Sequence, residues 1–476
     1  MQVLRRVSIA ALTCLVSSCV VGPIYQKPQP IVPSQFQAIL PVPEPSDEVT
    51  TNLTNWWSQF DDPVVRELVD AAQVANPTIA QSLARIVQAR ANVRVSDSAV
   101  FPILSADVNM TRSSQSPSPP EPPIVSTFSF RNLDASWELD LFGASRKRTE
   151  AAQARLTARI ADWQVTRVSL AAEVVTTLVD YRACEAATTM LMQDLKSREQ
   201  TKQLTDLKVN AGFTAPADGA LIDASVADAR QRLFSQQAQC DLDVKALVSL
   251  TDIAEQSLRI KIVGNSSLPH PRGISVESVP AKVLMQRPDI LSAERELAAA
   301  SNEVNVAEAD RYPHISILGS IGISDLRYEG ITTNSSTWSF GPTFSLPLFD
   351  GGRRRAAVDA AQGRLEEARA TYRLQVLNAV REIEGALVRL DSAARREVDA
   401  ASAARDYARY FEVNYDKYKA GGGSLFELEE ARRTMLNAQQ ALIGLQRDRI
   451  AAWIALYKAL GGGWIQGNKG VFPQAT

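Results

Sequence analysis

Two long stretches that contain few helix-ending signals constrain the fold of this chain more than any other feature. Residues 144–210 contain neither glycine nor proline, and the pattern over residues 353–420 is also helical. A helix that fills either stretch has about 65 residues and a length of roughly 100 Å. Because ordinary globular domains are narrower than that, we expect two long helices that pack closely along alanine-rich seams.

Each long helix is followed by a glycine-containing turn and a shorter helical pattern. The returning helices are expected at about 216–250 and 425–460. Glycine is favoured just after a helix because it adopts the left-handed conformation that ends the helix. The chain should therefore form two long antiparallel helical hairpins. The predicted turn residues are Gly212, Gly421, Gly422 and Gly423.

An internal repeat explains why these features occur twice. The phrase ELDLFGASRKR returns 207 residues later as SLPLFDGGRRR, and the helix starts at Pro77 and Pro288 are 211 residues apart. Proline in the first turn is a helix-start signal. The basic clusters in both phrases fit a position beside lipid headgroups, or simply a solvated helix start. We assign repeat one to residues 61–273, repeat two to residues 274–463, and a tail to residues 464–476.

Between the short and long helices of each repeat, the sequence alternates between apolar and polar residues. This alternation predicts strands with one apolar face at about 102–112, 127–142, 313–324 and 337–349. Strands of about ten residues fit a tilted crossing of a membrane, although a soluble hairpin alternates in the same way. Four strands cannot close a barrel in lipid, so we expect two or three copies to share one, and only a larger barrel leaves a channel.

Composition excludes several classes of protein. A net charge of −2 argues against a nucleic-acid-binding protein, and two histidines, His270 and His314, are too few for a multi-histidine metal site. The sequence has no glycine-rich phosphate loop and no nucleophile elbow. We therefore expect no enzyme activity, no metal and no cofactor.

The N-terminus is typical of an exported protein. Residues 1–18 combine a basic start with a short apolar run, which together predict a signal peptide. The run Leu-Val-Ser-Ser before Cys19 resembles the lipobox of bacterial lipoproteins, which implies acylation of Cys19 and, with valine next to it, sorting to the outer membrane. The alternative is ordinary signal cleavage with Cys19 as a bystander. Residues 19–60 are rich in proline and are expected to form an extended leader.

Specific motifs along nearly the whole mature chain identify a family. They are CVVGPIY at Cys19, the Trp56-Trp57 pair, Asn76-Pro77, RPDI at Arg287, LFDGGRRR at Leu348, YKAG at Tyr418 and LYKALGGGW at Leu456. With these motifs the chain resembles the TolC-like outer-membrane efflux channels, in their OprM/NodT lipoprotein branch. The resemblance implies a membrane α+β fold, in which a homotrimer forms a 12-stranded transmembrane β-barrel continued by a periplasmic α-helical barrel. It also implies a periplasmic adaptor and an inner-membrane pump of the resistance–nodulation–division type as partners, and outer-membrane lipid around the barrel.

The same resemblance places a gate at the periplasmic tip of the helices. It implies an acidic gate position at Glu430, where relatives usually carry aspartate, an apolar constriction at Phe426 and a latching tyrosine at Tyr418. Glu427 is added because it is close to them in sequence. Asp218 and Asp223 are further candidates in repeat one. A threefold acidic ring would attract cations, whereas Asp218 also fits a purely structural role at a helix N-terminus.

Two cysteines remain in the mature chain after Cys19. Cys184 and Cys240 are equally far from Gly212. In an antiparallel hairpin that turns at Gly212 they lie at the same height, so we expect a disulfide between them. The alternative is a pair of free buried thiols.

Two other functions fit parts of this sequence. The chain could be the outer-membrane channel of a type I protein secretion system, which shares the architecture but differs in its partners. It could also be a structural periplasmic coiled-coil lipoprotein, which accounts for the helices but leaves the four alternating strands unexplained. The sequence favours a passive exit channel of an efflux pump.

Overall fold

A computed structural model describes most of the chain, in two compact units. The described residues are 21–29, 36–38, 53–60, 62–116, 123–263, 268–269, 271, 284, 287–328 and 330–462. The predictions for residues 1–18, Cys19, His270 and the tail at 464–476 lie outside them. The first unit comprises residues 1–29, 84–160 and 292–373, and the second comprises residues 30–83, 161–291 and 374–476.

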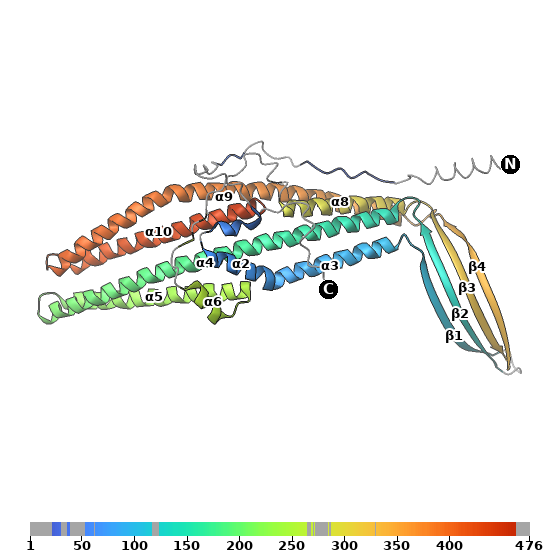
Figure 1. Cartoon of the computed structure of the whole chain (residues 1–476), viewed down its shortest axis with the longest axis horizontal. Coiled ribbons are helices and arrows are strands. Elements are labelled where there is room, and N and C mark those ends of the chain that lie inside the picture. The colour runs from blue at the N-terminus through green and yellow to red at the C-terminus, as the bar shows by residue number, and fades with distance from the viewer. Residues whose placement is uncertain are drawn as a thin grey trace. The chain divides into compact units, whose positions relative to one another are not determined.

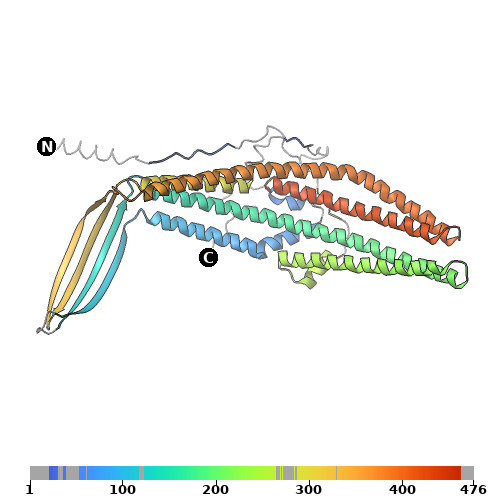
Figure 2. The same cartoon turned by 180° about the vertical axis from the view of Figure 1, so that it is seen from behind.

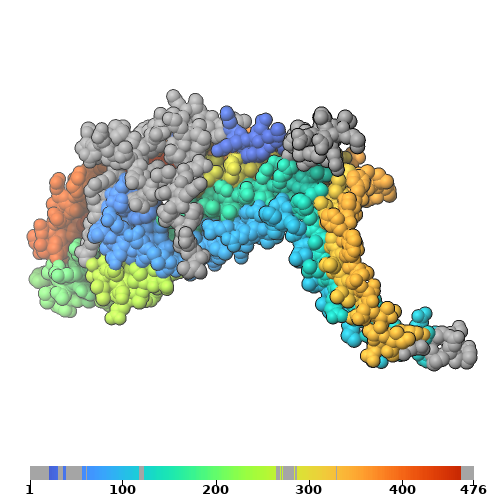
Figure 3. Space-filling view, turned by 45° about the vertical axis from the view of Figure 1, so that its right-hand side comes forward, coloured from blue at the N-terminus to red at the C-terminus, as the bar shows by residue number. Residues whose placement is uncertain are grey.

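The first unit contains one antiparallel sheet made of two hairpins. Its strands are β1 (Ile103–Gln115), β2 (Ile124–Leu139), β3 (His314–Tyr328) and β4 (Ile331–Ser345). They lie in the order β1-β2-β3-β4, so the two repeats meet where β2 pairs with β3 (Figures 1 and 3). The sheet therefore joins the two repeats through fourteen paired positions.

Apolar side chains occupy one face of this sheet in the half that adjoins the helices. Direct partners in neighbouring strands share a face, so the register defines this surface. Trp338 of β4 is opposite Ile321, and the Phe340 ring lies over Gly319 of β3. The face carries Leu104, Ala106, Val108, Leu133, Ala135, Trp137, Leu139, Ile315, Ile317, Ile321, Trp338, Phe340 and Phe344.

The strands extend beyond this apolar band, which the sequence did not indicate. On the same face, Arg131 of β2 pairs with Asp325 of β3 just past Leu133. β4 begins at Ile331, six residues before the predicted start, in the polar segment ITTNSS. The prediction of β2 at 127–142 was also displaced by three residues. Polar residues that continue a ladder keep its backbone hydrogen bonds but lose the apolar alternation from which a strand is inferred.

Four helices contribute to the first unit: α3 (Pro77–Ser98), α4 (Ala144–Asn210), α8 (Pro288–Ala309) and α9 (Arg353–Lys419). α3 and α8 begin with proline, which is compatible with the first helical turn. Both are followed within four residues by a second proline, which stops the helix. α4 and α9 have 67 residues each and continue into the second unit.

The repeated basic phrase marks the point where each long helix starts. At α4, the Asp140 carboxylate accepts hydrogen bonds from the backbone N–H groups of Ser145 and Arg146, both at 3.0 Å. At α9, Asp350 accepts them from Gly352 and Arg354, at 3.1 and 3.2 Å. A carboxylate thus satisfies free N–H groups at both helix starts. The two aspartates do not occupy equivalent positions of the phrase, so each repeat has its own cap.

In the second unit, the returning helices pack with two short N-terminal helices. Stacked aromatic rings and a buried arginine lie between them. It contains η1 (Leu53–Gln59), α2 (Pro63–Ala75), α5 (Pro216–Thr251), α6 (Glu255–Ile262) and α10 (Leu425–Ala459). Trp56 stacks on Tyr457 with ring centroids 5.1 Å apart. Arg182 is buried and donates to the carbonyl oxygen of Ile262 and to Asp62, the N-cap of α2. Of the described helices, none is both long and apolar enough to cross a membrane.

Candidate functional site

The tips of the two helical hairpins form the candidate site, and both lie in the second unit. α4 turns into α5 at one tip, α9 turns into α10 at the other, and both turns lie at the same end (Figure 2). Gly212 and Gly421 have φ of 76° and 80°, which favours glycine. At each tip the next residue donates to the carbonyl oxygen five positions back, at 2.8 Å for Phe213 and 3.0 Å for Gly422. This pattern is a Schellman motif, which ends a helix sharply.

An apolar cluster joins the two tips. Tyr418, Leu425 and Leu428 of repeat two pack with Ile222 of repeat one in a group of buried side chains. Leu204, on the long helix of repeat one, packs against the same group. The tips of the two repeats therefore share one small core.

Tyr418 anchors this junction with polar contacts as well. Its side chain is only 4% exposed, and its hydroxyl lies 2.7 Å from the hydroxyl of Thr205 on α4. The Lys208 ammonium group donates to the backbone carbonyl oxygen of Tyr418 at 3.0 Å and lies 4.0 Å from the centroid of the tyrosine ring. Tyr418 is thus held by the long helix of the other repeat through its hydroxyl, its ring and its backbone.

A buried ionic network crosses between the repeats next to this cluster. Arg432 of α10 is 0% exposed and donates to the hydroxyls of Ser197 and Thr201 on α4, at 2.7 and 3.0 Å. It also donates to Glu429 at 3.2 Å and lies 3.6 Å from Asp194. Burial lowers the pKa of the Arg432 guanidinium, and the negative charges of Glu429 and Asp194 oppose that change.

A second arginine completes the network from the side of repeat one. Arg198 of α4 donates to Asp194 at 2.8 Å and to Glu429 at 2.5 Å. Ser225 of α5 also donates to Glu429, at 2.7 Å. Two guanidinium groups and two carboxylates therefore alternate across α4 and α10, and their opposite charges balance. Asp194 Oδ1 is buried without a hydrogen bond, and Arg432 Nη1 lies 3.6 Å from it.

The residues expected at the gate of repeat two lie around this junction in different environments. Phe426 is 72% exposed and is free to project from the first turn of α10. Glu427 forms a capping box with Ser424, so its carboxylate has a structural role at the start of the helix. Glu430 pairs with Arg433 on the surface, and this hydrogen bond lowers the pKa of its carboxyl group.

The acidic candidates of repeat one are both paired. Asp218 lies in the first turn of α5 and accepts a hydrogen bond from the Thr214 hydroxyl. This contact fits the structural role at a helix N-terminus that its position already indicated. Asp223 pairs with Lys202 of α4 and raises the pKa of that ammonium group. The structure brings neither of them into the network of Arg432.

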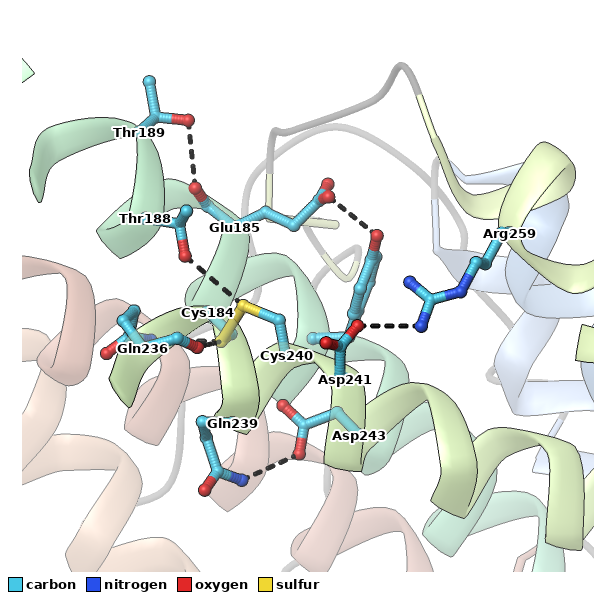
Figure 4. Close-up of a disulfide and its surroundings, with 11 residues drawn as sticks. Cys184, Glu185, Thr188, Thr189, Gln236, Gln239, Cys240, Asp241, Asp243 and Arg259 are labelled. Carbon is cyan, nitrogen blue, oxygen red and sulfur yellow. Dashed lines mark hydrogen bonds and ion pairs between the residues drawn. A yellow bond between two sulfur atoms is a disulfide. The ribbon is translucent and has the colours of Figure 1, made fainter. Parts of the chain in front are cut away.

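A disulfide ties the hairpin of repeat one farther from its tip. Cys184 of α4 and Cys240 of α5 are bonded, with Cα atoms 5.5 Å apart (Figure 4). Gln236 donates to Cys184 Sγ at 3.0 Å, and Thr188 lies 3.4 Å from Cys240 Sγ. The pairing inferred from their equal distance to Gly212 is thus present in the structure, whereas the sequence offers no cysteine pair to the hairpin of repeat two.

The sequence reasoning missed the residues of the ionic network. Asp194 and Arg198 are spaced i,i+4, and Glu429 and Arg432 are spaced i,i+3, as in many solvent-exposed helical ion pairs. Only the packing of the two hairpins shows that these pairs face each other. Burial of an arginine beside the exposed Arg433 is a feature that helical spacing alone does not reveal.

Comparison with known proteins agrees with this architecture. The family model described as outer membrane efflux protein matches residues 68–251 and 279–462, one segment in each repeat. The chain therefore belongs to the outer membrane efflux protein family, and its role as an outer-membrane efflux channel, not an enzyme, follows from that membership.

Individual relatives cover nearly the full length. Nodulation protein T of Rhizobium leguminosarum bv. trifolii is 30% identical over 461 residues, which cover 94% of this chain and 96% of that protein. The solvent efflux pump outer membrane protein SrpC of Pseudomonas putida is 28% identical, with coverage of 94% and 96%. The structure of the outer-membrane channel OprN matches with a TM-score of 0.82 at 29% identity and covers 94% of this chain and all of that one.

Proposed function

We propose that three copies of this chain form the exit channel of a tripartite efflux pump. The observation that supports this proposal is the open sheet with one apolar face. Its edge strands β1 and β4 have no second partner among the described residues. Unpaired strand edges are not stable in lipid, so the edges of neighbouring copies must pair with one another.

The number of copies follows from the space inside the barrel. Two copies would contribute eight strands, and the interior of an eight-stranded barrel is largely filled by side chains. Three copies would contribute twelve strands and leave an open interior. The polar face of the sheet, with Asp107, Asp134 and Asn132, then lines the water-filled side.

The contacts of the leader with α8 support a lipid anchor at Cys19. In the first unit, the Tyr25 hydroxyl donates to Glu294 of α8, and Asn305 donates to the carbonyl oxygen of Pro23 at 3.1 Å. Gly22 fits against Asn305 because a Cβ atom there would lie 2.1 Å from its Oδ1. An acyl chain on Cys19 would therefore start three residues from a segment that is fixed on α8.

The junction of the two tips supports a gate. The contacts of Tyr418 and of Arg432 with α4 hold the tip of repeat two against that of repeat one. Opening would separate these tips, with a periplasmic adaptor and an inner-membrane pump supplying the energy. The acidic side chains Glu427 and Glu430 would then attract cations to the entrance.

The cargo proposed for the channel consists of small molecules. The relative SrpC is named as a component of a solvent efflux pump, which favours small-molecule export over protein secretion. A coiled-coil rod does not require a four-stranded sheet, so the sheet argues against the structural alternative.

Cross-linking of the two sheet edges tests the trimer. Asn109 of β1 and Ser335 of β4 are at the same level of the sheet, because they are linked through the direct pairs Asn109–Phe130, Phe130–Ser324 and Ser324–Ser335. With Asn109→Cys and Ser335→Cys in one chain, a flexible bismaleimide should give a ladder that ends at three chains. The matched control, Asp134→Cys with Ser320→Cys, places the cysteines on the paired inner strands and should stay monomeric under denaturing conditions.

Either of two results would contradict the proposal: a ladder that stops at two chains, or one that continues beyond three. In the native host, loss of the gene should also increase retention of a fluorescent apolar dye. The wild-type gene should restore export. Unchanged retention would argue against the role in efflux.

A further inference from the structure

A cleft in the first unit is lined by an excess of arginine. It has a volume of about 890 Å³ and lies between α3, α4, α8 and α9. Two carboxylates, Glu303 and Asp310, also line it. The arginines of this cleft are Arg85, Arg148, Arg155, Arg159 and Arg364.

Ion pairs account for only part of this positive charge. Arg155 pairs with Glu303, Arg159 donates to Glu296 at 2.6 Å, and Arg364 lies 3.8 Å from Glu303. For Arg85 and Arg148, no carboxylate partner is found among the described residues. The cleft therefore keeps two guanidinium groups available for an anion.

The cleft lies on the face of α8 opposite to the leader. Asn305 holds the leader, whereas Glu303 and Ala307, two positions before and after it, line the cleft. A step of two residues turns an α-helix by about 200°, so these side chains point to opposite sides. A leader tethered to lipid must lie outside the tunnel, which places the cleft on the inside. This step rests on the proposed function.

We propose that the three copies of this cleft form an anion-binding belt inside the channel, which binds the carboxylate groups of transported small molecules. Guanidinium groups bind carboxylates through two parallel hydrogen bonds. The ion pairs of Arg155 and Arg159 attach α4, the helix that carries Arg148, to α8. A ring of like charge also concentrates counter-ions in a narrow passage.

Equilibrium dialysis with radiolabelled citrate tests the belt on the detergent-solubilised full chain. Citrate has three carboxylates and can enter from the barrel side whether or not the tips are closed. Wild-type protein should bind citrate saturably, and 0.5 M salt should weaken the binding because screening is strong at that concentration. The variant Arg85→Gln with Arg148→Gln should lose at least tenfold in affinity and keep its melting temperature.

A control of equal charge separates the cleft from general electrostatics. Arg94 of α3 and Arg373 of α9 are each nine residues from a cleft arginine, Arg85 and Arg364. Nine residues make about two and a half helical turns, so these side chains point to the side of the helix opposite to the cleft. Arg94→Gln with Arg373→Gln should keep citrate affinity within twofold of wild type. An equal loss in both double variants, or no saturable binding to wild type, would overturn the proposal.

Light scattering on the same samples separates this proposal from the proposed function. If the wild-type protein is a trimer and binds no citrate, only the belt is wrong. If the wild-type protein is not a trimer, the proposed channel itself is wrong. Dissociation of the trimer in the Arg85→Gln and Arg148→Gln variant would show that these arginines contact a neighbouring copy, and would also overturn the belt.

Discussion

The hydroxyl oxygens of Thr205 and Tyr418 lie 2.7 Å apart, although the two residues belong to different repeats of the chain. Tyr418 is buried, so water cannot readily replace this hydrogen bond. Together with Lys208 on the same side of α4, it makes the tip of repeat two dependent on the long helix of repeat one. In the proposed channel, this contact must break or move when the gate opens.

Removal of either hydroxyl should loosen the tip. Thr205→Val and Tyr418→Phe each delete one partner and keep the shape of the side chain. We expect each substitution to lower the free energy of unfolding by about 1 kcal/mol. The double variant should lose less than the sum of the two, because both substitutions remove the same hydrogen bond. Thermal unfolding measures the cost, and conductance in planar bilayers should rise. The Thr205 hydroxyl also donates to the carbonyl oxygen of Thr201, at 2.8 Å. Thr189→Val is the matched control, since Thr189 is an exposed threonine of α4 whose hydroxyl likewise donates to the carbonyl oxygen four residues back. Additive costs would contradict a direct hydrogen bond.

Substitution of Arg432 should destabilise the tips much more than substitution of its neighbour Arg433. Arg432→Leu removes a buried charge and leaves Asp194 and Glu429 with Arg198 as their remaining cation. Loss of one partner from a buried ionic network costs roughly 3 kcal/mol, and we also expect a higher conductance. Arg433→Leu should leave the melting temperature nearly unchanged, because the pair with Glu430 is exposed. Equal effects of the two substitutions would show that the network of Arg432 does not hold the tips.

Reduction of the disulfide should destabilise the hairpin of repeat one. A bond between residues separated by 56 positions restricts the unfolded chain by about 4 kcal/mol. Cys184→Ser with Cys240→Ser should therefore lower the melting temperature, and dithiothreitol should lower that of the wild type to the same value. The double variant itself should not respond to dithiothreitol. A wild-type protein that reacts with a thiol reagent without prior reduction would favour free thiols.

The effect of Glu430 on cation selectivity should be independent of pH near neutrality. Its pKa in the folded chain lies below the ordinary value of 4.5, because the hydrogen bond from Arg433 favours the charged form. The contribution of this pair to the stability of the folded chain is therefore present above the unfolded pKa of Glu430. It is lost as pH falls through the lower folded pKa. The difference in cation selectivity between wild type and Glu430→Gln should stay constant from pH 9 to pH 6 and disappear only well below pH 4.5. A change between pH 6 and pH 8 would point to another titrating group.

Acylation of Cys19 is tested by metabolic labelling with a radioactive fatty acid. The wild-type chain should incorporate the label, and Cys19→Ala should not. Cys14→Ala is the control, because Cys14 leaves with the predicted signal peptide and its loss should not affect labelling. Label retained in Cys19→Ala would favour ordinary signal cleavage.

The sequence predicts the helices of this fold well because their ends carry chemical signals. Proline at Pro77 and Pro288, and glycine at Gly212 and Gly421, fix the helix limits to within a few residues of the observed ones. The strand ends were less accurate, because β4 begins in a polar segment that shows no alternation. There the backbone ladder continues without an apolar face to reveal it.

The contacts between repeats could not be predicted in the same way. Asp194 and Arg432 are far apart in the sequence, and each also has an ordinary ion-pair partner on its own helix. Whether such pairs meet depends on how one hairpin rotates against the other, which no local pattern encodes. The arginine-lined cleft could not be predicted for the same reason, because its arginines come from three helices.

The central claim, that three chains form one hollow channel, is tested most directly by electron microscopy of the detergent-purified protein, with its mass measured by light scattering. Our account predicts a particle with threefold symmetry, an open interior and the protein mass of three chains. A compact monomer, or a solid rod of any mass, would contradict it.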